Sequence, residues 1–260
     1  MSASILRSPS VSHPRPQATV AERVEPAWRP LYRVAGVAAL LSIAFTFLAV
    51  IVFIVNPPPT TITAWFALFQ RNGLLGLVDL DLLMLATYVL MGVIYLALYG
   101  ALRRGHEPVM ALATLCGLVS IVTYIASNTG FNLLVLSGQY AAATTEGQRA
   151  AIRAAGQAML AIWQGTAYDV SYVLGGVATL LVAAVMLRSH VFGRGTAFVG
   201  LVLGVLMLVP ATAGPIGLYL SLVSLVPTVI WFALLAWRFF QLAARPAQDG
   251  SGTPAVAPMA

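Results

Sequence analysis

The sequence predicts an all-α polytopic membrane protein, and three observations support this prediction. First, 60% of the 260 residues are hydrophobic and only 8% are charged, whereas a soluble domain carries about 25% charged residues. Second, six apolar segments approach or exceed the roughly 20 residues that a helix needs to cross a bilayer. Third, the arginines gather at alternate ends of these segments. So few charges cannot cover a water-facing surface of this size, and we therefore expect lipid to be the main solvent.

Both ends of the chain differ in composition from the region between them. Residues 1–29 are rich in Ser, Pro, Ala and Arg without apolar periodicity, and 245–260 are rich in Pro and Gly. Such segments cannot bury enough apolar surface to fold, and too many polar residues precede the first apolar block for a signal peptide. We expect two disordered cytoplasmic tails around one transmembrane domain, residues 30–244.

Six spans are predicted, each bounded by residues that stop a helix. The first ends at a run of three prolines after Asn56, and the second ends at Arg103-Arg104-Gly105. The fifth is the shortest and ends near Pro210. The predicted spans are about Leu31–Val55, Leu74–Leu102, Val109–Val135, Trp163–Leu187, Thr196–Val209 and Ile216–Phe240.

The arginines predict the orientation. With the N-terminus inside, eleven of the fourteen basic residues, all of which are Arg, fall on the cytoplasmic side. Arg71, Arg149 and Arg153 remain outside. Positive residues favour the cytoplasmic side of a membrane. An even number of spans then returns the C-terminus to the cytoplasm.

Three shorter patterns predict local structure. The aromatic segment Thr63–Arg71 is typical of a short helix in the outer membrane interface. The sequence Thr145-Glu146-Gly147-Gln148 fits a capping box, which predicts a helix that continues into the fourth span. Gly200 and Gly204 form a GxxxG motif, which we expect to pack inside the bundle rather than to dimerise.

Charged side chains at membrane depth are costly and indicate functional sites. Asp79 and Asp81 lie five and seven residues into the second predicted span, and Asp169 lies in the outer third of the fourth. The third span places its asparagines near the same outer level. The candidate polar layer is therefore Asp79, Asp81, Asn128, Asn132, Tyr168 and Asp169.

The spacing of these residues also predicts which helix faces point inward. Asp81, Tyr88 and Tyr95 are seven residues apart and share one face. Asp79 cannot share it, because two helical residues turn through about 200°. An alternative is a structural role, in which an outer Asp pairs with Arg71, Arg149 or Arg153 and holds helices together.

Several kinds of chemistry are disfavoured by position. His106 and His190 fall in predicted cytoplasmic loops and His13 in the tail, across the membrane from the carboxylates, so neither a metal site nor a Ser/His/Asp arrangement is expected. The chain has no Lys for a phosphate-binding loop. We therefore assign no catalytic residue, metal or cofactor, and we expect the lipid bilayer rather than nucleic acid as the main partner.

Three functions remain compatible with the sequence. The first is a non-enzymatic membrane protein with a polar, outward-facing pocket that binds or passes a small solute, for which a cation is one candidate. The second is a structural or regulatory membrane subunit without a ligand of its own. The third, less favoured, is an intramembrane enzyme that modifies lipid with Asp79 or Asp81 as acid or base. A proton relay is disfavoured because the inner half of the bundle is mostly apolar.

Several short stretches resemble an uncharacterised bacterial family of small polytopic membrane proteins, a domain of unknown function. They cover roughly Leu31 to Gly204, and Gly193 stands where that family tends to have Pro. The resemblance implies six spans and the bacterial cytoplasmic (inner) membrane, with no activity attached. The stretches that carry it are Leu31–Gly36, Arg71–Asp79, Leu98–Arg103, Leu133–Gly138 and Arg188–Arg194.

Overall fold

The computed structural model describes residues 26–244, and this part of the chain is built from helices and the turns between them. The predicted tails fall almost wholly outside it, but helical structure begins at Pro26, ahead of the expected boundary at residue 30. The helices are η2 (Pro26–Trp28), α1 (Arg29–Val55), α2 (Ile62–Arg71), α3 (Gly73–Asp79), α4 (Leu82–Leu102), α5 (Glu107–Ser127), α6 (Gly130–Ala142), α7 (Glu146–Trp163), α8 (Thr166–Arg188), α9 (Arg194–Leu206) and α10 (Gly214–Ala244).

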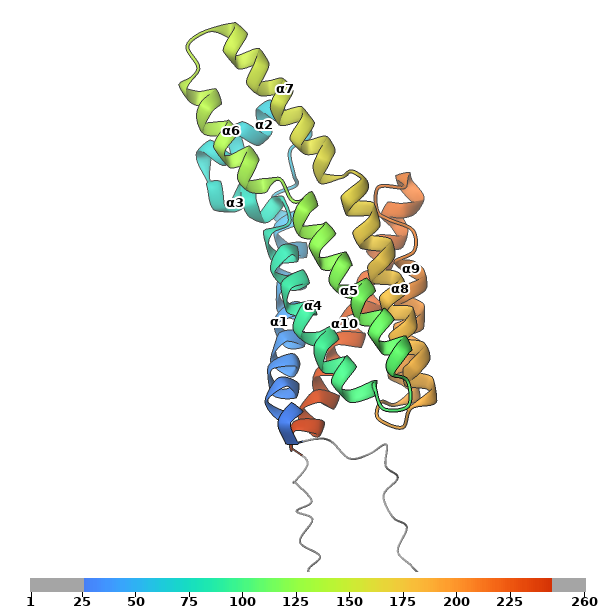
Figure 1. The fold of residues 1–260 in the computed structure, drawn as a ribbon. Coiled ribbons are helices and arrows are strands. Elements are labelled where there is room, and N and C mark those ends of the chain that lie inside the picture. Colours follow the sequence, from blue (N-terminus) through green and yellow to red (C-terminus); the bar gives the residue numbers. More distant parts are fainter. Residues whose placement is uncertain (1–25, 245–260) are drawn as a thin grey trace, which may run out of the picture.

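Helices α1, α4, α5, α8, α9 and α10 form a bundle, and both ends of the described chain lie at one end of it (Figure 1). Tyr32 near the start of α1 stacks on Phe239 near the end of α10, with ring centroids 6.1 Å apart. The loop between α8 and α9 reaches the same place, because Phe192 contacts Phe239 edge to face. We call this the terminal end of the bundle, and the opposite end the distal end.

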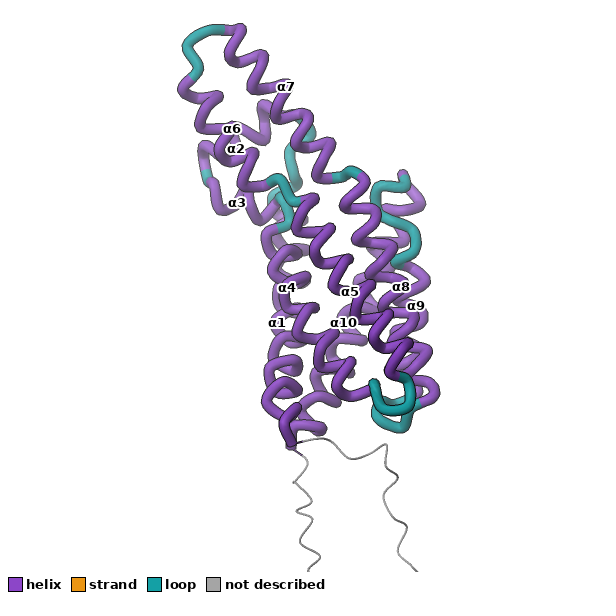
Figure 2. The backbone as a smooth tube through the Cα atoms, in the orientation of Figure 1, coloured by secondary structure: helices purple, strands orange, loops and turns teal. Residues whose placement is uncertain are grey.

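The distal end is covered by a second packing unit, the distal subdomain, made of α2, α3, α6 and α7 (Figure 2). Its core is rich in aromatic residues, including Trp65, Phe66 and Phe69 of α2. The prediction of a short helix here is confirmed in outline, but Thr61 rather than Thr63 is its N-cap. Its aromatic residues are buried instead of facing outward, because α6 and α7 pack against them and cover them.

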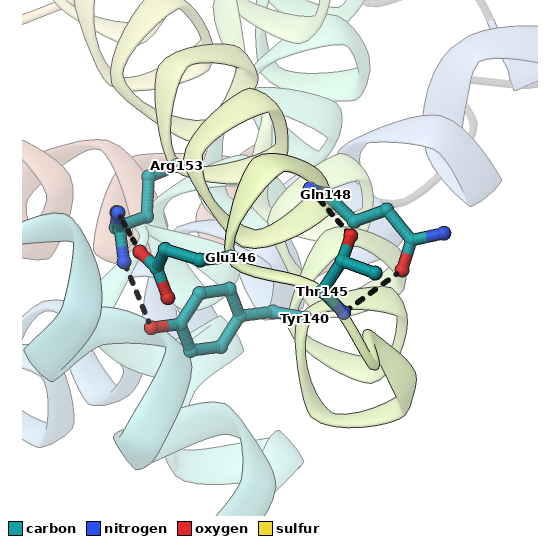
Figure 3. A network of polar contacts seen from close by, with 5 residues as sticks. All are labelled: Tyr140, Thr145, Glu146, Gln148 and Arg153. Carbon is teal, nitrogen blue, oxygen red and sulfur yellow. Dashed lines mark hydrogen bonds and ion pairs between the residues drawn. The ribbon is translucent and has the colours of Figure 1, made fainter.

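The predicted capping box at the start of α7 is confirmed. Thr145 Oγ1 accepts a hydrogen bond from the backbone N–H of Gln148 at 3.2 Å, and the Gln148 side chain accepts one from the Thr145 N–H at 3.4 Å (Figure 3). Two of the unpaired N–H groups at the helix start are thereby satisfied. The helix then approaches α8, from which only Gln164 and Gly165 separate it.

The bundle exposes large apolar side chains that water would disfavour. Ile54 is 73% exposed and Ile216 is 71% exposed, and many other valines and leucines of α1, α5 and α10 are also exposed. Five helical segments are long and apolar enough to cross a membrane: Arg29–Val55, Leu82–Leu102, Glu107–Ala142, Glu146–Arg188 and Gly214–Ala244. These lengths and this surface indicate a membrane protein.

Helix α9, which corresponds to the predicted fifth span, is shorter than these five. Its 13 residues extend over about 20 Å, compared with a hydrocarbon core of about 30 Å. Its GxxxG motif packs within the bundle, as predicted. A Cβ built on Gly204 would lie 2.6 Å from Leu180 Cγ and 3.1 Å from the Gly176 carbonyl oxygen. Six complete spans therefore remain a prediction.

Three breaks in the helices lie at the junction between the bundle and the distal subdomain. They separate α3 from α4, α5 from α6, and α7 from α8. The predicted second span is therefore interrupted, and α4 begins only at Leu82. The Asn128 side-chain amide donates to the Leu80 carbonyl at 2.8 Å, and Thr129 Oγ1 donates to the Met159 carbonyl at 3.0 Å. These bonds tie the three junctions to one another.

Candidate functional site

A cavity of about 180 Å³ lies inside the bundle, between all six of its helices. An engineered apolar cavity of about 150 Å³ is large enough to bind benzene, so this space suits a ligand of similar size. Asp81 is the one carboxylate among the described residues that line it. The remaining lining combines tyrosines, methionines, serines and threonines with a few larger apolar groups.

The backbone at Asp81 directs its carboxylate into this cavity. Asp81 is the only described non-glycine residue with a positive φ, 66°, in the left-handed region that Asp and Asn tolerate better than most residues. It is also the N-cap residue of α4, where the positive end of the helix favours an anion. The turn at this position thus places a negative group at the distal end of α4.

Two donors hold the Asp81 carboxylate in place. The indole Nε1 of Trp163, at the end of α7, donates to Oδ2 at 3.1 Å. The hydroxyl of Tyr124, on α5, is its second hydrogen-bond partner. Asp81 lies just before the span that begins at Leu82, and burial raises its pKa to about 6 although both hydrogen bonds act in the opposite direction. Above that pH the carboxylate is mainly in its negatively charged form.

Four tyrosines form a continuous row along the cavity wall. Tyr88 and Tyr124 stack face to face with centroids 3.8 Å apart, and Tyr124 contacts Tyr168 at 6.1 Å. Tyr168 in turn contacts Tyr172 at 6.1 Å. The row joins α4, α5 and α8. Because the faces of Tyr88 and Tyr124 cover each other, the row does not offer the open box of aromatic faces that binds a quaternary ammonium group.

Six hydroxyl groups of the lining donate their single proton to backbone carbonyls. Ser120 Oγ, for example, donates to Ser171 O at 2.7 Å, which links α5 to α8. A hydroxyl that has donated its proton retains lone pairs that can accept. Toward the cavity these groups are therefore hydrogen-bond acceptors, like the carboxylate above them. The six are Thr46, Thr87, Ser120, Thr179, Ser224 and Thr228.

The six residues of the predicted polar layer lie in different environments. Asp81 and Tyr168 line the cavity. Asn128 bonds the backbone at the α5–α6 junction, and Asn132 is exposed on α6. Asp79 is buried at the end of α3 without a hydrogen-bond partner, and the Asp169 carboxylate accepts a hydrogen bond from Thr212. The helix breaks cause this dispersal, because the prediction assumed uninterrupted helices.

Sequence reasoning missed two contributors to the site, the hydrogen-bond donor to Asp81 and the part of the cavity lining that comes from α10. Trp163 was taken only as the start of a span, and nothing in the sequence connects it to Asp81. The polar face of α10 carried a detectable signal. Ser221, Ser224 and Thr228 are spaced three and four residues apart, as expected for one side of a helix.

The expected pairing of an outer arginine with one of the aspartates is wrong for Arg153. Its guanidinium contacts Glu146 Oε1 at 2.6 Å and lies 3.5 Å from the Tyr140 hydroxyl (Figure 3). All three residues belong to the hairpin of α6 and α7, away from the cavity. Asp79 accepts no hydrogen bond from any described residue, so Arg71 does not pair with it either.

Comparison with known proteins adds no functional assignment. No family model matches this chain, and no match is found among curated proteins or solved structures. The resemblance to a bacterial family therefore stays a prediction, and the function has to be argued from the geometry of the cavity.

Proposed function

We propose that the chain is a six-pass integral protein of the bacterial inner membrane that binds a small protonated organic cation. The terminal end then faces the cytoplasm, because the loops at that end carry Arg103, Arg104, Arg188 and Arg194. The distal end and Asp81 face outward. The protein takes up or senses its ligand without chemically changing it.

The single observation that carries this proposal is the carboxylate of Asp81, the one charged group among the described residues that line the cavity. Inside a protein, an anion among hydroxyl oxygens that can accept hydrogen bonds favours a positively charged donor. An ammonium or guanidinium group supplies several N–H donors, whereas a quaternary ammonium group supplies none. The ligand class is therefore a protonated amine or guanidine with a small apolar body of about benzene size.

The arrangement favours binding over the alternative of a lipid-modifying enzyme. Acid–base chemistry with two carboxylates needs both of them beside the reacting atoms. Only Asp81 lines the cavity, while Asp79 and Asp169 lie outside the lining.

The turn after α9 also supports access by water. Irregular backbone at membrane depth is tolerated where it lines a polar cavity, and Met207 of this turn does so.

The test compares a charged ligand with a neutral molecule of the same shape. Thermal unfolding of the purified protein in detergent is followed with benzylammonium and with benzyl alcohol. Benzylammonium should stabilise the wild type, by about 2.7 kcal/mol at a hundredfold excess over Kd, and benzyl alcohol should not.

The matched variants are Asp81→Asn and Asp169→Asn, each of which removes one carboxylate. Asp81→Asn should abolish the response to benzylammonium, because it removes the charge while keeping a residue that tolerates the left-handed backbone. Asp169→Asn should retain the response. Equal stabilisation by benzyl alcohol, or an unchanged response of Asp81→Asn, would refute the proposal.

A further inference from the structure

Asp79 is a buried carboxyl group without any compensating interaction. It is 1% exposed, and neither of its side-chain oxygens has a hydrogen-bond partner. A carboxylate anion in such a place loses its hydration and gains nothing in return, whereas the neutral acid loses much less. Burial accordingly raises the pKa of Asp79, which precedes the span that begins at Leu82. The geometry therefore favours a protonated side chain.

The two neighbouring carboxyl groups have opposite environments. Asp79 is the last residue of α3, where the free carbonyl groups of a helix end disfavour an anion. Asp81, two residues later, is the N-cap of α4 and accepts from Trp163 and Tyr124. One hinge between two helices thus holds an acid in the neutral form beside an acid in the charged form. Environments that push the pKa values of two carboxyl groups apart are a feature of sites that transfer protons.

The helices packed against α3 provide no charge that changes this balance. Burial is the only cause that shifts the pKa of Asp79. Helix α2 carries Arg71, which is exposed, and α4 is preceded by Asp81. The charged and titratable groups of the other packed helices lie at ends remote from α3 or line the cavity: Arg29, Tyr32 and Arg33 of α1, Tyr88, Tyr95 and Tyr99 of α4, and Tyr140 of α6.

We propose that Asp79 is a proton-binding site, protonated in this conformation, which releases its proton to water when α3 swings away at the Leu80–Asp81 hinge. The O–H bond of the acid breaks, and a water molecule at the distal end accepts the proton. As an extension that rests on the proposed function, the proton is coupled to the cation at Asp81, because a movement at this hinge displaces the backbone turn that directs the Asp81 carboxylate into the cavity.

The sign of the coupling follows from linkage. The closed conformation has the higher pKa at Asp79, so its advantage is complete below the open-state pKa and is lost as pH rises from there to the raised closed-state pKa. Ionisation of Asp81 acts in the opposite sense, since cation affinity rises as pH rises through about 6. Affinity for a cation of constant charge should therefore pass through a maximum and fall on the alkaline side.

The first experiment detects the proton directly and needs no ligand. Infrared spectra of the wild type at neutral pH should contain the C=O stretching band of a buried protonated carboxyl group. Asp79→Asn should lack this band, and Asp81→Asn should keep it. A spectrum of Asp79→Asn identical to that of the wild type in this region would overturn the proposal, and so would an absence of the band in the wild type.

The second experiment measures the coupling by titrating benzylguanidinium, whose guanidinium group stays protonated at all relevant pH values. Wild-type affinity should fall on the alkaline side, approaching tenfold per pH unit. Asp79→Asn mimics the neutral acid, so its affinity should rise to a plateau and stay there. A wild-type affinity without an alkaline fall refutes the coupling even if the variant does not fold. If benzylguanidinium binds at no pH, the proposed function fails while the infrared result still decides the proton site.

Discussion

At the scale of single residues, Asp81 combines a strained backbone conformation with a carboxylate that accepts hydrogen bonds from two neighbouring side chains. Its φ of 66° brings Cβ close to the backbone, which costs about 1–2 kcal/mol for an ordinary side chain. Residues held in such conformations cluster at functional sites, where the surrounding structure maintains them. Here Trp163 and Tyr124 hold the carboxylate, so the strain and the hydrogen bonds act on the same group.

Replacement of Asp81 by small residues should separate these two effects. Asp81→Gly and Asp81→Ala both remove the carboxylate, but only glycine adopts the left-handed conformation freely. We expect Asp81→Gly to be more stable than Asp81→Ala by about 1 kcal/mol, measured by thermal unfolding in detergent. Equal stabilities would mean that the backbone at this position relaxes without cost.

Gly117 controls the position of a cavity residue. A Cβ at this position would lie 2.5 Å from the Tyr95 ring, so Gly117→Ala forces that ring to move. We expect a loss of about 1–3 kcal/mol in stability and weaker binding of benzylammonium. Gly138→Ala is the matched control, because a Cβ there meets nothing within 4 Å, and it should stabilise the helix by about 0.5–1 kcal/mol. Similar thermal unfolding of the two variants would contradict the prediction.

At the scale of helices, the three junctions form one layer between the bundle and the distal subdomain. Each is bonded to a neighbour by a side chain: Asn128 to Leu80, Thr129 to Met159, and Trp163 to Asp81. A movement of the distal subdomain must therefore break or preserve these bonds together. The layer connects the position of α7 to the carboxylate that faces the cavity.

Thr129→Val should loosen this layer without changing its shape. The substitution removes the hydrogen bond that Thr129 donates to the Met159 carbonyl, and one such bond contributes about 0.5–1.5 kcal/mol. We expect faster amide hydrogen exchange in α6 and α7, with unchanged exchange at the terminal ends of α1 and α10. Thr123→Val is the control, because the Thr123 hydroxyl bonds only within α5. Equal exchange in the two variants would show that the junction bond does not restrain the subdomain.

The sequence was sufficient to predict the ends of most helices but not the breaks within them. Proline runs and arginine pairs mark the ends of α1 and α4, and the capping box marks the start of α7. Leu80-Asp81 contains neither Pro nor Gly, and its turn depends on Asn128 from another helix. The seven-residue spacing placed Asp81, Tyr88 and Tyr95 on one face. Asn132 and Asp79 lie on the far side of helix breaks, and these breaks depend on hydrogen bonds between residues that are far apart in the sequence.

At the scale of the whole molecule, the ends of α1 and α10 pack together, so the described chain starts and finishes on the same side. This arrangement requires an even number of passes, and α9 together with the turn at 207–213 supplies the sixth in the proposed topology. The hairpin of α6 and α7 then projects outside the cell, and the loops beside Arg103 and Arg188 lie inside.

Cysteine labelling should test this topology. Cys116→Ala removes the native thiol, and Gly147→Cys and Gly193→Cys then place single thiols where a Cβ meets nothing within 4 Å. A membrane-impermeant maleimide should label position 147 in intact cells, and position 193 only after permeabilisation. Labelling of both positions in intact cells, or the reverse pattern, would contradict the proposed orientation.

The shortness of α9 has a consequence for the surrounding lipid. A Cβ on Gly176, ten residues into α8, would lie 3.1 Å from Met207 just beyond the end of α9, so α9 stops about 15 Å below the start of α8. Apolar side chains of α9 itself, such as Phe198 and Val202, remain exposed. A bilayer adjusts to a short apolar surface by thinning locally. The protein should therefore carry a thinned patch of membrane along one flank, which would favour its accumulation in thinner or more deformable bilayers.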